Sequence, residues 1–587
     1  MQPDVQPEAP VEGPSASLDK AVAGPALRQP GPGRLLRGGG AMSERPDRFQ
    51  TFTAVAIALT AALTALVALL QADAAGRDDR ANRDSKRYAT EAMGRQVAGD
   101  ARTNYDYYTA FQAWNEYATL AEAARGRGDA AAARRFEKLQ KRVEPLTPLL
   151  APPYLDAARQ EADVARWEAE TYVQEIAGLR ERYVAASGVK EAWDAKANTY
   201  IVHLTLMAVG LALFGLSATL AGVGTRVLFT SVGGVLVGMA TLWAGATWLR
   251  SVPDLREKSG AIEAFAKGAG LAHRERWDEA VKAYTEALTV APDYVQALTA
   301  RAEGYASLGQ RAEAAADYEK ALALGDGRAW VAGSLAWIQY EQGRFQEAVE
   351  TNRKALAHGP DELWIQFDLG LAQLAAGDVA AARATYEAGA GQAARMVAEA
   401  KAARREAPSL VWESLEDAGQ SLDGLIEVID GDGTEPPKDK LGQAQAVRPE
   451  AEKLLTTVKS LAVALEYGGA PPAGTASTGI GELRFAAAGV EEEAESFPDD
   501  TANVALRFDY EGLKDGQLVV IKVYLDGEED PAWRFVSPWD QGAQGAAERL
   551  LAPAQGGTFV MPGGEYHVEV YVDGHLAQRG SFEVAAD

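Results

Sequence analysis

The side chains that most often perform catalysis or bind metals are sparse in this sequence. The chain contains no cysteine, so disulfides, thiolate zinc sites and cysteine nucleophiles are excluded. Its five histidines are scattered and have no metal-ligand spacing; they are His203, His273, His358, His567 and His575. The sequence holds no P-loop, no G-x-S-x-G motif and no H-E-x-x-H motif. We therefore predict no catalytic residue, no cofactor and no metal site, and we expect a protein that is not an enzyme.

Charge and length narrow the class of protein further. The net charge is −25 over 587 residues, which argues against a nucleic-acid partner because such a partner needs a basic face. The many carboxylates on predicted helices are interpreted as solvated faces. A chain of this length is too long for one ordinary core, so we expect several domains.

Two ionisable residues interrupt an apolar run from Tyr200 to Leu249. The run has about 50 residues, and one membrane span needs about 20, so we predict two spans, at 200–221 and 227–249. The turn between them is marked by Gly222, Gly224 and Arg226. In a turn the guanidinium stays solvated, whereas at mid-bilayer it would cost about 2.5–3.5 kcal/mol.

The other ionisable residue of the run, His203, is placed one turn inside the predicted membrane boundary. Its position makes it a candidate functional group, but the spans contain no carboxylate to partner it. Gly234 and Gly238 form a G-x-x-x-G pair, which predicts close packing between transmembrane helices. The small number of polar groups in the spans argues against a transporter.

An earlier apolar segment predicts a first span at 47–71. The 21 residues Thr51–Gln71 carry no charge and are long enough to cross a bilayer; a cleaved signal peptide is the alternative. The segment 1–46 is rich in Pro, Gly and Ala, which predicts a disordered tail. Translation could instead start at Met42.

Three spans place the segment 72–199 and everything after Leu249 on the same side of the membrane. Arginines before the first span, together with Arg226, favour a cytoplasmic N-terminus, although basic residues also follow the first and third spans. We therefore expect a multi-pass protein of an inner or plasma membrane, with both large soluble parts on the extracytoplasmic side.

The segment 72–199 is rich in helix-forming residues and predicts a helical hairpin. The prolines of "EPLTPLLAPPY" at 144–154 predict its far turn. Five aromatic residues recur at steps of three and four and predict one stripe along a helix: Tyr105, Tyr108, Phe111, Trp114 and Tyr117. The stripe indicates a seam between the two arms; a ligand-sensing face is the alternative.

A 34-residue period runs through four copies from 261 to 396. Small residues recur at its eighth, twentieth and twenty-seventh positions, as in Gly268, Ala280 and Ala287, and Tyr284 stands at the twenty-fourth. Small residues allow two helices to touch, and a ring fills the space between them. This pattern resembles the tetratricopeptide repeat. The second copy lacks the usual proline, and the third has Asn352 where a ring is expected.

The resemblance implies a concave groove that binds protein segments, lined by the first helix of each repeat. The groove residues implied in this chain are unusually apolar and aromatic: Ile262, Phe265, Trp330, Trp337, Tyr340, Trp364 and Phe367. They would form a clamp for a partner. The alternative is that the helical region 397–468 packs into the groove or caps the repeats.

Alternating apolar residues and Asp-Gly turns after a linker at 469–479 predict an antiparallel β-sandwich at 480–587. The ending "PGGEYHVEVYVDGHLAQRGSFEV" resembles the last hairpin of immunoglobulin-like modules that are common in exported bacterial proteins. Trp533 and Trp539 are interpreted as core or edge residues, with surface recognition as the alternative.

The sequence thus predicts a multidomain, mainly α protein: three transmembrane helices, a helical hairpin and a tetratricopeptide α-solenoid, followed by a β-sandwich. We expect a membrane-anchored, non-catalytic scaffold that binds other proteins, with the lipid bilayer as its second partner and homo-oligomerisation left open. The alternative is a membrane sensor in which the segment 72–199 binds a ligand and signals through the transmembrane hairpin.

Overall fold

The structure, a computed structural model, describes residues 48–156, 159, 161–252, 258–431, 433–441, 444–467, 479–499, 501–552 and 560–585. The predicted tail at 1–46, including Met42, lies outside the described residues, as does all but the last residue of the predicted linker at 469–479. The chain divides into two compact units: Met1–Leu69 with Ile201–Ala246, and Leu70–Tyr200 with Thr247–Asp587.

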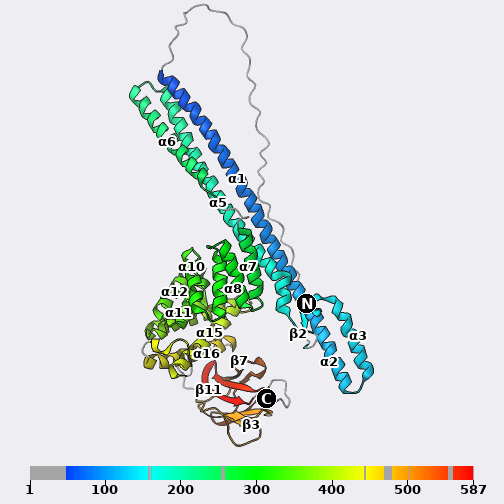
Figure 1. Cartoon of the computed structure of the whole chain (residues 1–587). Helices are drawn as coiled ribbons and strands as arrows, with labels where there is room; N and C mark the ends of the chain where they lie inside the picture. The colour runs from blue at the N-terminus through cyan, green and yellow to red at the C-terminus, as the bar shows by residue number, and fades with distance from the viewer. Residues whose placement is uncertain are drawn as a thin grey trace, which may run out of the picture. The chain divides into compact units, whose positions relative to one another are not determined.

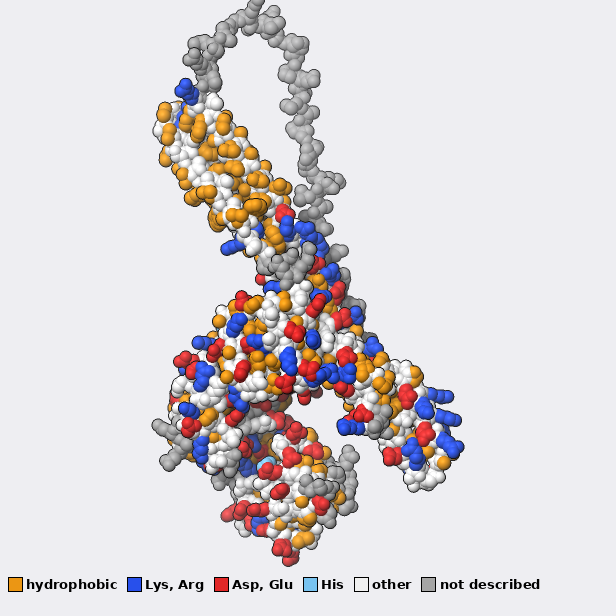
Figure 2. Space-filling model, in the orientation of Figure 1, with side chains coloured by type: hydrophobic (Ala, Val, Ile, Leu, Met, Phe, Trp, Pro, Cys, Tyr) orange, Lys and Arg blue, Asp and Glu red, His pale blue; other side chains and the backbone are white. Residues whose placement is uncertain are grey.

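Within the described part of the first unit, the elements are segments of three helices: α1 (Arg48–Thr103), α5 (Gln174–Thr219) and α6 (Val223–Leu249). Each is long and apolar enough to cross a membrane, judged by length and composition. Large apolar side chains such as Leu59 and Leu242 are exposed, and Figure 2 shows hydrophobic side chains gathered along these helices. This is the reverse of a water-soluble bundle, in which the apolar stripe faces inward.

The turn between α5 and α6 is shorter than the sequence predicts. Helix α6 begins at Val223, so Gly224 and Arg226 lie in its first turns and only Gly222 lies in the loop. The Arg226 Nε donates a hydrogen bond of 2.5 Å to the carbonyl oxygen of Leu220. Arg226 therefore ties the start of α6 to the end of α5.

The close approach between α5 and α6 involves other glycines than those predicted. A Cβ built on Gly234 or Gly238 would meet no atom of another helix within 4 Å, whereas a Cβ on Gly210 would meet Val237 Cγ2 at 2.4 Å. A Cβ on Gly233 would lie 3.1 Å from the Gly210 carbonyl oxygen. This corrects the expectation that Gly234 and Gly238 pack the hairpin, because within this chain they face away from the neighbouring helix.

The segment 72–199 contains a helical hairpin whose far turn differs from the predicted one. The chain turns at Arg127–Asp129, between α2 (Gln112–Gly126) and α3 (Ala130–Val143), with Gly128 at φ 75°. The proline-rich stretch instead forms short 3-10 turns that contact the base of the hairpin. The 3-10 turns of this stretch are η2 (Glu144–Leu146) and η3 (Pro148–Leu150), and they are followed by β1 (Leu155–Asp156), β2 (Glu161–Ala162) and α4 (Val164–Glu168).

The predicted aromatic stripe is broken by a π-helix, η1 (Asn104–Phe111). Phe111 and Trp114 are buried, but Tyr105 and Tyr108 are 46% and 65% exposed. Tyr107 stacks on Phe111 instead, with ring centroids 5.5 Å apart. A π-helix has wider turns than an α-helix, so residues at α-helical spacing no longer share a face. A second π-helix, η4 (Ala169–Val173), precedes α5.

Eight helices between 259 and 402 form the repeats (Figure 1). They are α7 (Ser259–Ala272), α8 (Trp277–Val290), α9 (Val295–Ser307), α10 (Arg311–Ala323), α11 (Ala329–Glu341), α12 (Phe345–His358), α13 (Leu363–Ala375) and α14 (Val379–Ala402). The helical region 397–468 then provides the end of α14 together with α15 (Ser409–Asp430), η6 (Lys438–Lys440) and α16 (Ala444–Tyr467).

Two sheets form the C-terminal part. One has the order β4-β11-β10-β6-β7, with β8 also paired to β6, and the other has the order β3-β5-β9. The strands are β3 (Arg484–Ala487), β4 (Ser496–Phe497), β5 (Val504–Glu511), β6 (Leu518–Leu525), β7 (Glu528–Glu529), β8 (Phe535–Pro538), β9 (Gln544–Leu551), β10 (Gly564–Val572) and β11 (His575–Val584), with η7 (Pro531–Trp533) before β8. One hydrophobic core joins both sheets and includes the buried Trp533 and Trp539. The immunoglobulin-like resemblance stays a prediction.

A buried ion pair joins the last helix to this sheet region. Lys459 on α16 lies 2.5 Å from Glu569 on β10 and 3.1 Å from Asp423 on α15. Glu569 is 3% exposed and also accepts hydrogen bonds from the hydroxyls of Tyr524 and Tyr571. The helices that follow the repeats therefore contact both the repeats and the β-sandwich.

Candidate partner-binding site

Small residues bring the two helices of each repeat into contact. A Cβ on Gly268 would lie 2.5 Å from the Tyr284 ring, and one on Gly370 would lie 2.6 Å from the Tyr386 ring. The alanine at the twentieth position of each repeat is fully buried, as Ala280 is. The small residues of the 34-residue pattern therefore mark direct contacts between helices. In the first and fourth repeats, a tyrosine ring packs against a glycine.

The first repeat packs against α5 and the π-helix before it. Gln174 lies so close to Gly270 that any Cβ there would clash, at 2.3 Å. His273 Nε2 lies 2.8 Å from a carboxylate oxygen of Glu168, and the Tyr294 hydroxyl donates a 2.7 Å hydrogen bond to Glu181. These contacts shield the first end of the repeats.

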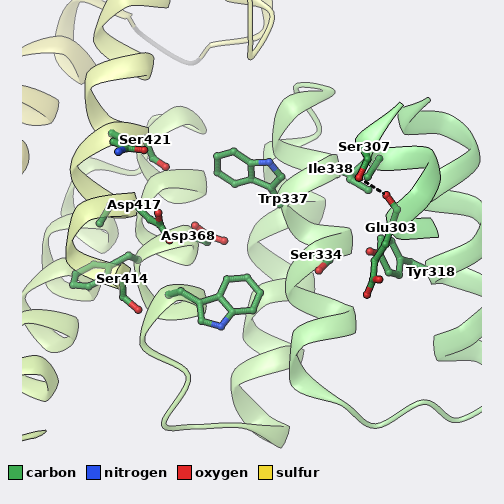
Figure 3. Close-up of a pocket in the computed structure, with 15 residues that line it drawn as sticks. Glu303, Ser307, Tyr318, Ser334, Trp337, Ile338, Asp368, Ser414, Asp417 and Ser421 are labelled. Atoms are coloured by element: carbon green, nitrogen blue, oxygen red, sulfur yellow. Dashed lines mark hydrogen bonds between the residues drawn. The ribbon is translucent and has the colours of Figure 1, made fainter. Parts of the chain in front are cut away.

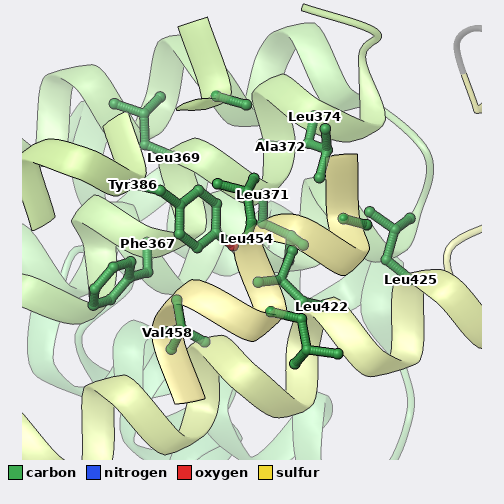
Figure 4. Packing of buried hydrophobic residues seen from close by; sticks show 14 of the residues in the cluster. Phe367, Leu369, Leu371, Ala372, Leu374, Tyr386, Leu422, Leu425, Leu454 and Val458 are labelled. Atoms are coloured by element: carbon green, nitrogen blue, oxygen red, sulfur yellow. The ribbon is translucent and has the colours of Figure 1, made fainter. Parts of the chain in front are cut away.

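The other end of the repeats is covered by α15 and α16. Leu371 of α13, Leu422 of α15 and Leu454 of α16 belong to one buried cluster, and Figure 4 shows their side chains interleaved. An array of repeats exposes an apolar face at its end unless another element covers it. Helices α15 and α16, from the region 397–468, therefore cap the last repeat, as the alternative expectation held. They do not fill the groove completely.

A cavity of about 570 Å³ remains between the repeats and α15. Helices α9, α10, α11 and α13 supply one side, and the first half of α15 supplies the other. Figure 3 shows the Trp337 indole and the Asp368 carboxylate in the middle, with Asp417 and Ser414 on one side and Glu303 on the opposite side. The volume falls within the range of about 300–1,000 Å³ that is typical of ligand pockets.

Three of the seven predicted groove residues line this cavity: Trp337, Trp364 and Phe367. Tyr340 is buried and stacks on Trp337, with ring centroids 5.3 Å apart. The remaining three do not line it: Ile262 is buried, Phe265 packs on Tyr284 and Tyr294, and Trp330 lies beneath the Arg328 guanidinium. The clamp itself remains a prediction, and its candidate residues are now confined to the last two repeats.

Both tryptophan rings of the cavity are held in place by their surroundings. Trp364 packs against the backbone of Gly333, where a Cβ would lie 2.4 Å from the ring. Its Nε1 donates a 3.2 Å hydrogen bond to Glu362. With Trp337 fixed by Tyr340, the two indoles present their faces without a large loss of side-chain freedom on binding.

Sequence reasoning missed the polar residues of the cavity. Glu303 occupies the same repeat position as Trp337, so the repeat alignment could have identified it, whereas Asp368 stands one position after the groove residue Phe367. Asp417 and Ser414 come from α15, outside the repeats, and no periodic signal in the sequence places them there.

Burial perturbs the carboxyl groups of the cavity. It raises the pKa of Asp368 from 3.8 to about 7, and the nearby charge of Asp417 adds to the effect. Burial also raises the pKa of Asp417, with a further contribution from Glu413. Burial raises the pKa of Glu303, opposed by the charge of Arg328. For Asp368 and Asp417, the raised pKa reflects lost hydration with no cation among its causes.

The predicted membrane residues are distant from this cavity in the sequence and belong to the first unit. His203 is buried beside Trp243, with ring centroids 4.7 Å apart in an edge-on arrangement. The turn residue Arg226 also lies over the ring of Phe49, 5.5 Å from its centroid.

No family model matches the chain. Over 101 residues it is 33% identical to Hsp70-Hsp90 organizing protein 1 of Glycine max, a match that spans 17% of this chain and 18% of that relative. Among solved structures, the MamA protein is 16% identical, covers 36% of this chain and 97% of its own, and has a TM-score of 0.26. YrrB, described as a TPR protein with an unusual peptide-binding site, is also 16% identical, covers 36% of this chain and 93% of its own, and has a TM-score of 0.24.

Proposed function

We propose that this tetratricopeptide repeat protein is a membrane-anchored scaffold that holds a partner protein through the cavity between its repeats and α15. The observation that carries the proposal is the cavity itself. It keeps Trp337 and Trp364 accessible at groove positions even though α15 and α16 cover the end of the repeats. Aromatic residues in concave, pre-formed sites are frequent anchors for partner proteins.

The three long apolar helices support the membrane part of the proposal. Side chains such as Val235 and Leu242 are 60% and 78% exposed, an arrangement that is stable in hydrocarbon and unfavourable in water. Helices are also a form in which a chain satisfies its backbone hydrogen bonds inside a bilayer. In this proposal the repeats and the β-sandwich share the extracytoplasmic side.

Membrane attachment and orientation are tested with the full chain expressed in a bacterial host. We expect it to stay in the membrane fraction after washing with alkaline carbonate, and its C-terminal domain to be degraded when protease is added to intact spheroplasts. Release by carbonate would contradict the anchor. Protection from protease would reverse the orientation without affecting the anchor.

Partner binding is tested by affinity purification from solubilised membranes of the native organism. The double variant Trp337→Ala, Trp364→Ala should lose proteins that the wild-type chain retains, because both rings line the cavity. The matched control is Trp330→Ala, which removes a repeat tryptophan outside the cavity. Retention of every partner by the double variant, with its helical circular dichroism unchanged, would refute binding through this site.

A further inference from the structure

The polar groups of the cavity share one sign of charge. Glu303 on α9, Asp368 on α13 and Asp417 on α15 are all acidic, and the lining contains no lysine, arginine or histidine among the described residues. The three carboxylates therefore come from three helices far apart in the sequence. Their convergence depends on the packing of α15 against the repeats.

These carboxylates lack partners within the described part of the chain. Neither a hydrogen bond nor an ion pair to Glu303, Asp368 or Asp417 side-chain oxygens is present among those residues. The hydroxyl of Ser414 also lines the cavity; this residue is 1% exposed and its oxygen has no hydrogen-bond partner among the described residues. Ser414 is the buried member of this set, and buried polar groups are usually paired, because leaving them unpaired costs free energy. The Glu303 and Asp417 side chains are exposed, and Asp368 is half-buried. The cavity thus offers unused acceptors to a ligand that carries donors.

The aromatic residues of the cavity suit the same kind of ligand. Trp337 and Trp364 place two indole rings beside the acidic groups, and indole faces attract cations more strongly than other aromatic side chains do. An acidic or phosphorylated segment would meet acidic groups here, and like charges repel one another. A purely apolar segment would leave the carboxylates and Ser414 without partners.

We propose that this cavity binds an arginine or lysine side chain presented by the partner protein, an inference that rests on the proposed scaffold function. Asp368 and Asp417 pair with the cationic head, Ser414 accepts an N–H, and Trp337 stacks on it. Arginine is preferred, because its planar guanidinium stacks on rings and its N–H groups reach several acceptors at once.

Peptide libraries test this assignment with the purified full chain in detergent micelles. Pools of acetylated, amidated pentapeptides carry random flanks and one fixed central residue: arginine, lysine, glutamate, leucine or citrulline, the uncharged counterpart of arginine. We expect the arginine pool to be retained at least tenfold more than the citrulline and glutamate pools. The double variant Asp368→Asn, Asp417→Asn should bring arginine within twofold of citrulline.

The control variant is Asp361→Asn, which removes an exposed carboxylate just before α13 and should leave retention unchanged. Equal retention of arginine and citrulline, no retention of any pool, or arginine retention that survives the double variant would each overturn the assignment. So would binding of free choline that depends on Asp368 without any selection of basic peptides. If partner capture still required Trp337 and Trp364 after such a result, the scaffold proposal would stand while this inference would not.

Discussion

The perturbed carboxyl of Asp368 makes a prediction that does not depend on any partner. Its pKa is about 7 in the folded chain, against an ordinary value of 3.8. Between these values the folded state keeps a proton that the unfolded state has lost, so stability falls as the pH rises from about 4 to about 7. Asp368→Asn removes this penalty and should stabilise the packing of α13 against α15 at pH 8.

The magnitude follows from the pKa difference. The whole difference corresponds to about 4 kcal/mol, but the carboxylate faces an open cavity and solvent screens part of this cost. We therefore expect about 2 kcal/mol at pH 8, which is about thirtyfold in the equilibrium for opening α15. The stabilisation by Asp368→Asn should shrink toward zero as the pH falls to 4. The charged groups nearest to Asp368 are Asp417 on α15 and, once ionised, Tyr340 and Tyr386.

The absence of cysteine allows a local assay in the full chain. Val411 on α15 is fully buried in the cluster that joins the helices, so a Val411→Cys thiol reacts with dithiodipyridine only when α15 opens. The labelling rate, normalised to a free thiol at each pH, should be about thirtyfold lower with Asp368→Asn at pH 8. The control variant is Asp361→Asn, which removes an exposed charge and should leave the labelling rate of the Val411→Cys thiol unchanged. A change of less than threefold at pH 8, or an equal change at pH 4, would refute the reasoning.

Two further predictions concern the packing around the repeats. Lys459→Met should weaken the contact between α16 and the β-sandwich by about 3–5 kcal/mol, because it leaves the buried Glu569 without its cation. Limited proteolysis should release the β-sandwich faster from this variant than from the control variant Lys453→Met. Equal rates of release would contradict the role of the ion pair. Gly333→Ala should destabilise the repeats by about 1–3 kcal/mol, because its Cβ would lie 2.4 Å from the Trp364 ring. Thermal unfolding followed by circular dichroism measures the loss of stability. An unchanged unfolding midpoint would show that the ring moves freely.

Periodic features of the sequence were sufficient to predict the types of element. The 34-residue pattern predicted the helix pairs between 261 and 396, because small residues at fixed positions are needed wherever two helices touch. Long apolar runs identified the three helices that could cross a membrane, and alternating residues identified the strands. These signals are local, so each segment of the chain carries its own evidence.

Tertiary packing decided the details that sequence periodicity could not reach. The aromatic stripe failed because the π-helix at 104–111 shifts the face on which later residues lie. The glycines that pack α5 on α6 are Gly210 and Gly233, since helix rotation decides which glycine meets its neighbour.

Some residues of the candidate site could be predicted from the sequence, and others are brought there only by tertiary packing. The resemblance to the tetratricopeptide repeat implied Trp337, Trp364 and Phe367, because it assigns fixed positions of each repeat to a groove. Asp417 and Ser414 enter the cavity only because α15 folds back onto α13, a contact that depends on complementary apolar surfaces far apart in the sequence. The sequence by itself therefore determined a repeat protein with aromatic residues at groove positions, and only the tertiary structure decided that α15 adds Asp417 and Ser414 beside them.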